Sequence, residues 1–198
     1  MLSDRESQRE AMETQKVLGS ASNRPPEVWV SDGEERRMRI RDAGPVALIF
    51  RYSVKVNGKW QRFTAPEPGE QDLFKDRGFR AALQAVYEVI DIDGYTNREG
   101  KKIKGEPRFF VANSKLHEQL EYIRRKKGGS LALFDIEIRR TGADKNTMYS
   151  AIPDSPSPVR PEWKAKPRLS KDFAKYYAPL TPKQQQAVLG NASYDDER

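Results

Sequence analysis

Apolar and polar residues alternate from residue 28 to about residue 64, which is the period of a β-strand with one buried face. In the first run, Met38 and Ile40 fall on one face and the neighbouring arginines fall on the other. Two further runs flank Asn57-Gly58, a dipeptide that favours a type I′ hairpin turn because both residues tolerate positive φ. The pattern predicts a strand followed by a β-hairpin.

The segment after this hairpin carries weaker signals. We expect residues 66–82 to form a loop with one helical turn. Residues 86–92 and 108–111 alternate again and are separated by a long polar stretch, so they predict the arms of another hairpin.

One later segment has the period of an amphipathic helix. Leu116, Leu120 and Ile123 recur at helical spacing, and a glycine pair follows them. Asn113 or Ser114 stands where a side chain can cap the first turn. This is the main helix that the sequence predicts.

The order of these elements suggests the fold. Strands follow one another, a single main helix is inserted, and a last strand pair turns at about residues 141–146. This order is typical of a mainly β (β+α) protein, and we expect an OB-fold-like five-stranded Greek-key barrel with extra hairpins. We expect residues 27–158 to form this core, 1–26 a flexible arm, and 159–198 a proline-rich linker with short helices and an acidic tail.

Charge narrows the choice of partner. The 198-residue chain has a net charge of +7 and a pI near 9.5, which favours nucleic acid first and an acidic protein or membrane surface second. The excess is local, because residues 34–62 hold eight bases and three acids. There is no cysteine, which excludes disulfides and thiol chemistry, and no apolar run that would cross a membrane. We expect a soluble cytoplasmic protein.

Cations and aromatic rings that interleave on strands are typical of single-stranded nucleic-acid binding. The cations expected to neutralise phosphates are Arg37, Arg39, Arg41, Arg51, Lys55 and Arg62. The rings expected to stack on bases are Tyr52, Trp60, Phe63 and Tyr95. The cations expected to extend this track are Lys101, Lys102, Arg139 and Arg140. The alternative is a solvated strand face whose charges protect a sheet edge.

Enzymatic functions have less support in the sequence. His117 is the only histidine, so neither a histidine metal site nor a catalytic triad is expected. Asp135 and Glu137 share a strand face and could hold magnesium in a nuclease, but Arg139 beside them more simply forms ion pairs with them. We therefore predict that the protein is not an enzyme and uses no metal or cofactor.

Residues 108–159, RFFVANSKLHEQLEYIRRKKGGSLALFDIEIRRTGADKNTMYSAIPDSPSPV, resemble the C-terminal half of the core of tailed-phage single-stranded DNA-binding proteins of the T4 type. The pattern is a strand, a helix with a Leu-x-x-x-Leu stripe, a glycine turn, a strand ending in Arg-Thr-Gly, and a proline stop. The stretches VYEVIDIDGYTNREGKKIK before it and APLTPKQQQAVLG after it are similar to the same family. The resemblance spans about residues 28–190.

This resemblance implies an OB-fold core that binds single-stranded DNA without sequence preference in phage replication, recombination or repair. It also implies an acidic C-terminal tail that contacts replication or recombination proteins. Family members often carry a Cys and His zinc site, and the absence of thiols here predicts a zinc-free protein. The tail is reduced to Asp195, Asp196 and Glu197 before Arg198, and the N-terminal arm is neutral. Two other functions stay open: a phage adaptor or assembly protein that binds an acidic partner, and a metal-dependent nuclease.

Overall fold

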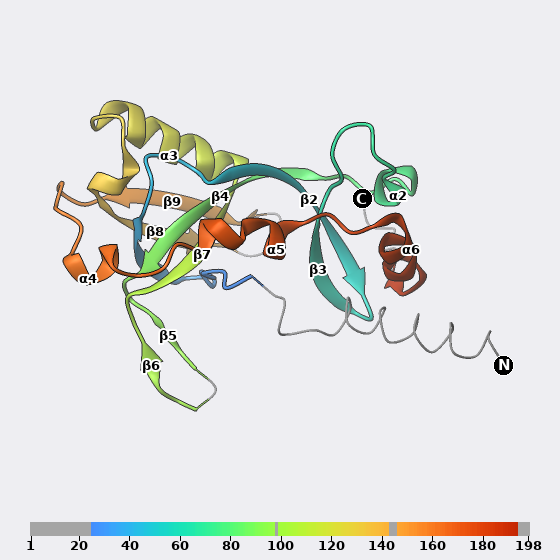
Figure 1. The fold of residues 1–198 in the computed structure, drawn as a ribbon, viewed down its shortest axis with the longest axis horizontal. Helices are drawn as coiled ribbons and strands as arrows, with labels where there is room; N and C mark the ends of the chain where they lie inside the picture. Colours follow the sequence, from blue (N-terminus) through green and yellow to red (C-terminus); the bar gives the residue numbers. More distant parts are fainter. Residues whose placement is uncertain (1–24, 98, 143–145, 194–198) are drawn as a thin grey trace. The chain divides into compact units, whose positions relative to one another are not determined.

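The computed structural model shows a mainly β protein, with antiparallel strands and a few helices (Figure 1). This confirms the fold class expected from the sequence at its coarse level. The structure describes residues 25–97, 99–142 and 146–193, so that most of the expected arm and the acidic end of the tail lie outside the described residues. None of the helices in these ranges combines the length and the apolar character needed to cross a membrane.

The chain divides into two compact units. The sheet unit comprises residues 26–49 and 83–172, and the hairpin unit includes the described residues 50–82 and 173–193. These units differ from the expected core at 27–158, because a middle part of that range packs with the C-terminal segment.

Five antiparallel strands form the sheet of the sheet unit, paired in the order β7, β4, β1, β8, β9. Their bounds are β1 Glu35–Ile40, β4 Ala82–Asp91, β7 Glu106–Asn113, β8 Asp135–Thr141 and β9 Met148–Pro153. The expected hairpin after residue 86 is confirmed as β4 and β7, and the last strand pair as β8 and β9. Among the described residues no pairing joins β9 to β7, so no closed barrel was found.

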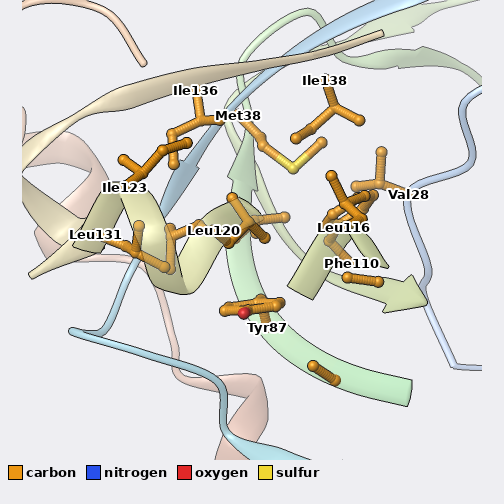
Figure 2. Close-up of a cluster of buried hydrophobic side chains, with 14 of the residues drawn as sticks. Val28, Met38, Tyr87, Phe110, Leu116, Leu120, Ile123, Leu131, Ile136 and Ile138 are labelled. Carbon is orange, nitrogen blue, oxygen red and sulfur yellow. The ribbon is translucent and has the colours of Figure 1, made fainter. Parts of the chain in front are cut away.

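Helix α3 (Ser114–Lys126) covers one face of this sheet (Figure 1). Asn113 caps it as expected, because its side-chain oxygen accepts the backbone N–H of Leu116 at 2.9 Å. Figure 2 shows the apolar side chains of α3 beside those of the strands, and the buried cluster includes Leu116, Leu120, Ile123, Met38, Ile40, Ile136 and Ile138. This cluster is the larger core of the described chain.

Tyr87 and His117 form a polar contact at this core. The Tyr87 hydroxyl lies 2.7 Å from His117 Nδ1, and Tyr87 is fully buried. Burial is the main cause that raises the pKa of Tyr87, so its hydroxyl remains protonated. The single histidine therefore packs against the core and has a hydrogen-bond partner there.

The chain after β9 folds back onto the sheet unit, from the end of the expected core into the expected proline-rich linker, where Arg41 donates to the Lys166 and Pro167 carbonyls. Asp154 donates its N–H to the Asp135 carbonyl at 2.8 Å, and Ser157 donates to the Leu133 carbonyl at 3.0 Å. The short helical elements of this unit are η2 (Leu131–Leu133), α4 (Pro161–Lys164) and η4 (Leu169–Asp172).

A small separate hairpin lies between β4 and β7 in the chain. It consists of β5 (Tyr95–Thr96) and β6 (Lys102–Ile103), paired antiparallel. Figure 1 shows this hairpin projecting from one end of the five-stranded sheet. It corresponds to the long polar stretch that the sequence placed between two hairpin arms.

The hairpin unit is built on β2 (Ala47–Val56), of which residues 50–56 belong to this unit, and β3 (Lys59–Thr64). The turn between them has Asn57 at φ 49° and Gly58 at φ 75°, the two positive values that a type I′ turn requires. The expected hairpin is thus confirmed. The other elements are α2 (Leu73–Asp76), α5 (Phe173–Tyr177), α6 (Pro182–Gly190) and β10 (Ala192–Ser193), which pairs with β2.

One side of this hairpin forms the core of the hairpin unit, with α2 and α6. The buried cluster consists of Tyr52, Val54, Val56, Phe63, Phe74, Val188 and Leu189. Gln185 of α6 is buried beside it, where its Oε1 accepts the Leu73 N–H at 2.8 Å and its Nε2 donates to the Leu180 carbonyl at 2.9 Å. Because both ends of the amide are bonded, burial leaves no unpaired polar group on this side chain.

A capping box at Thr181 holds the start of α6. The Thr181 hydroxyl accepts the Gln184 N–H at 3.4 Å, and Gln184 Oε1 accepts the Thr181 N–H at 2.9 Å. Thr181→Ala is expected to lower the free energy of unfolding by about 1 kcal/mol in a urea titration. Thr181→Asp keeps a capping oxygen and should lose less stability. Equal losses in the two variants would contradict the capping role.

Candidate nucleic-acid interface

The register of β2 and β3 decides which side chains of the hairpin share a face. Residues directly opposite each other in an antiparallel pair project to the same side. The opposed pairs on one side are Lys55 with Trp60, Ser53 with Arg62, and Arg51 with Thr64. We call these six side chains the hairpin face.

Tyr52 and Phe63, two rings expected to stack on bases, project to the other side of the hairpin. Tyr52 is only 3% exposed, and both rings lie against Phe74, with centroid distances of 5.2 and 5.5 Å. The Tyr52 hydroxyl donates to Asp72 Oδ2 at 2.6 Å. Burial is the main cause that raises the pKa of Tyr52, and this hydrogen bond is the second. Contrary to the expectation, neither ring can stack on a base, because the core covers both.

The hairpin face is basic and carries an exposed aromatic ring. Trp60 is 65% exposed, Arg62 is also exposed, and Lys55 is half-buried. Residues 50–64 include four bases and no acid. An exposed indole can stack on an unpaired base while neighbouring cations meet the phosphates on either side. The geometry of this face therefore suits a single-stranded nucleic acid.

Arg51 lies at the covered end of the hairpin face. It is 7% exposed, and its guanidinium carbon lies 5.4 Å from the centroid of the Tyr177 ring. Tyr177 in turn stacks on Phe173 at 4.8 Å, so α5 supplies the cover. The expected phosphate contact at Arg51 is corrected to a cation–π contact inside the unit. No local pattern in the sequence links Arg51 with Tyr177.

Arg39 was also expected to bind a phosphate, but it is 1% exposed. Its guanidinium pairs at 2.5 Å with Asp135, its cross-strand neighbour on β8. It also donates to the carbonyls of Ala132 and Ser157, at 3.1 and 2.9 Å. Arg39 therefore fastens the segment after β9 to the sheet and is out of reach of a phosphate.

Arg41 has a similar structural role. It donates to Glu88 Oε1 at 2.7 Å and to the carbonyls of Trp163, Lys166 and Pro167 at 3.3, 2.9 and 2.6 Å. These carbonyls lie at the end of α4 and just after it, so Arg41 ties this part of the chain to the end of β1. Burial lowers the pKa of Arg41, and the Glu88 carboxylate opposes that effect. The expectation of a phosphate contact at Arg41 is corrected in the same way.

Arg37 and Arg139 stay at the surface but have carboxylate partners there. Arg37 pairs with Asp93 at 3.3 Å, and Arg139 pairs with Glu35 at 3.1 Å and with Glu137 at 2.6 Å. The hydrogen bond to Glu137 is the main cause that raises the pKa of Arg139. A nucleic acid would have to compete with these carboxylates for either arginine.

The two acids considered for a nuclease metal site are also in ion pairs. Glu137 pairs with Arg139, as the sequence suggested, whereas Asp135 pairs with Arg39. Within the ranges that the structure describes, no three His, Cys, Asp or Glu side chains are grouped so that they could hold a metal ion.

Arg140 lies between two rings of the sheet unit. Its guanidinium carbon is 5.8 Å from the ring centroid of Trp29 and 6.0 Å from that of Tyr149, and Nη1 donates to the Val30 carbonyl at 3.2 Å. Trp29 is 51% exposed and was not among the rings expected to stack. Its sequence context, a short alternating run, did not distinguish it from rings that are buried.

The remaining expected residues belong to the β5–β6 hairpin. Tyr95 is half-buried, and the guanidinium carbon of Arg108 lies 4.3 Å from its ring centroid, so one face of the ring is occupied. Lys101 and Lys102 are exposed.

The structure thus brings Arg51, Lys55, Trp60 and Arg62 together on the hairpin face. Tyr52 and Phe63 lie on its buried side, and the other expected residues belong to the sheet unit. Comparison of the chain with protein-family models, with curated protein sequences and with solved structures found no match.

Proposed function

We propose that this protein binds single-stranded nucleic acid with little sequence preference and that the hairpin face makes the contact. The observation that carries the proposal is Trp60, an indole exposed to 65% on a strand face that it shares with Lys55 and Arg62. Stacking on such a ring does not depend on the identity of the base, because every base has a π-face. An unpaired strand is required, because a base inside a duplex is already stacked.

The cations of the hairpin face supply the second part of the binding energy. Lys55 lies directly opposite Trp60, and Arg62 is two residues further along β3. A strand whose base stacks on Trp60 would bring its neighbouring phosphates within reach of these two side chains. Each neutralised phosphate releases counterions, so affinity should fall as salt rises.

The resemblance to phage single-stranded DNA-binding proteins extends this proposal to a biological role. We propose protection of single-stranded DNA in the cytoplasm of a phage-infected cell during replication, recombination or repair. We also propose an OB-like relationship for the strand, helix and strand formed by β7, α3 and β8, supported by their order along the chain. The acidic tail would then recruit replication or recombination proteins.

Trp60→Ala is expected to weaken binding to a fluorescent oligo-dT strand about 5- to 150-fold, because stacking contributes about 1 to 3 kcal/mol per base. The measurement is anisotropy at about 50 and 200 mM salt, and wild-type affinity should be lower at the higher concentration. Trp60→Phe keeps an aromatic ring and should retain part of the affinity.

Trp29→Ala is the matched control, since it removes another half-exposed indole from the sheet unit. It should bind oligo-dT like the wild type. If the wild type fails to bind the strand, or if both alanine variants lose equal affinity, the hairpin face is not the binding site. Salt-sensitive binding to an acidic protein, without binding to the strand, would support the adaptor function.

A further inference from the structure

The β5–β6 hairpin carries an open group of cations in the sheet unit. Lys101, Lys102 and Lys104 are all exposed, and none of their ammonium groups forms an ion pair with the described residues. The arginines of β1 behave differently, because Arg37 and Arg39 each pair with a carboxylate. The lysine ammonium groups of this hairpin are therefore accessible to a ligand, whereas these two guanidinium groups of β1 form ion pairs within the sheet unit.

Hydrogen bonds connect the described residues of the hairpin tip. Asn97 Oδ1 accepts two backbone N–H groups, from Glu99 at 3.0 Å and from Lys101 at 2.9 Å. The Gly100 N–H donates to the Asn97 carbonyl at 3.0 Å. Lys101 thus leaves the tip from a backbone that is fixed by several hydrogen bonds.

The root of the hairpin is anchored to a buried acid. Asp91 accepts the Gly94 N–H through Oδ1 at 3.0 Å and the Gly105 N–H through its carbonyl at 2.8 Å. Arg36 donates to the Gly94 carbonyl from the neighbouring strand. Gly94 has φ +72°, and a Cβ there would lie 2.0 Å from the Ile103 carbonyl oxygen, so the two strands approach as closely as glycine allows. The hairpin is therefore a preformed projection.

This projection offers exposed cations and one half-buried ring. Tyr95, its aromatic residue, has the Arg108 guanidinium over one face, and the other exposed side chains of β5 and β6 are Thr96 and Lys102. Such a surface can neutralise phosphates, and its half-buried ring is less available to an unpaired base than Trp60 is. Phosphates of paired strands would serve it as well as those of single strands.

We propose that the β5–β6 hairpin is a second nucleic-acid contact and that it binds the phosphate backbone of duplex DNA. A two-stranded β-ribbon fits the major groove, which is about 12 Å wide. Lysines at the tip and along β6 would then face the phosphates that line the groove. The inference shares with the proposed function only the assumption of a nucleic-acid ligand, because the hairpin face supplies single-strand binding independently.

The test removes the three charges together, as Lys101→Gln, Lys102→Gln and Lys104→Gln in the full chain. The matched control replaces three exposed lysines elsewhere in the same unit, namely Lys115→Gln, Lys164→Gln and Lys171→Gln. Both variants are titrated by anisotropy with a blunt DNA duplex, with oligo-dT, and with a labelled poly-glutamate peptide of equal charge.

The slope of log affinity against log salt on the duplex is expected to fall by up to about 2.7 in the hairpin variant, and by less in the control. Its affinity for oligo-dT should stay within about twofold of the wild type, and Trp60→Ala should show the converse pattern. Absence of wild-type duplex binding, or equal loss in the hairpin and control variants, would overturn the inference. Equal affinity for poly-glutamate would also overturn it and would indicate an acidic protein partner. If Trp60→Ala binds oligo-dT as tightly as the wild type does, the proposed function is contradicted, but the inference about the β5–β6 hairpin is not.

Discussion

Glu88→Gln is expected to lower the free energy of unfolding by about 3 to 5 kcal/mol, since it removes one member of a buried ion-pair network. The Glu88 side chain is fully buried, and its carboxylate lies 2.7 Å from Arg41 Nη1 and 3.3 Å from Arg168 Nε. It also accepts the Ser170 N–H at 3.0 Å. Glutamine fills the same space but leaves two guanidinium groups short of a negative charge.

Guanidinium chloride titration of the two proteins would measure this loss. Glu121→Gln is the control, because Glu121 pairs with Arg124 within α3 at 2.6 Å and both side chains are only half-buried. That substitution should cost about 0.5 kcal/mol or less. If Glu88→Gln costs no more than the control, the network does not hold the sheet unit together.

Phe74→Ala is expected to cost about 3 to 5 kcal/mol of unfolding free energy in the hairpin unit. Phe74 is fully buried, and its ring lies 5.2 Å from Tyr52, 5.5 Å from Phe63 and 6.1 Å from Phe79, measured between centroids. Alanine would leave a cavity between α2 and the hairpin. Hydrogen exchange should then rise in residues 50–82 and 173–193.

The same substitution should weaken binding to oligo-dT, although Phe74 lies on the side opposite the hairpin face. The reason is that Trp60 and Arg62 are held in place by strands whose other side packs on this ring. Phe50→Ala removes an exposed ring from the same unit and should change stability and binding little. Full affinity in a Phe74→Ala protein with increased exchange would show that the hairpin face does not need its core.

The elements predicted correctly depend on short stretches of sequence. Asn57-Gly58 specifies a turn with two positive φ values, and Asn113 caps the start of α3. In each case the hydrogen bonds or dihedral angles involve residues at most a few positions apart. Such signals can be interpreted without knowing the rest of the fold.

The arginine row shows what a local interpretation misses. Residues 34–62 hold only three acids, but Arg39 and Arg41 pair with Asp135 and Glu88 on other strands. Alternation correctly placed these arginines opposite Met38 and Ile40. It could not reveal that the segment after β9 would cover the arginine side of the sheet.

The sequence predicted only part of the candidate site, because the alternation of residues does not show which side of the hairpin is buried. Alternation separates Arg51 and Lys55 from Tyr52, but it does not state which side of a hairpin becomes core. Only the register shows that Tyr52 and Trp60 project to opposite sides. Barrel closure is harder still to foresee, because it depends on pairing between edge strands that are distant in sequence.

The contacts of Arg41 also define where the sheet unit can be shortened. Prolines after β9 invite a cut near Pro158, yet such a cut would remove the three carbonyls that Arg41 binds and the Arg168 partner of Glu88. The buried Arg41–Glu88 ion pair would then be exposed to water, and Arg41 would lose its three carbonyl acceptors. A boundary placed at these prolines would separate Arg41 and Glu88 from their partners. A boundary after Asp172 would keep those partners in the sheet unit.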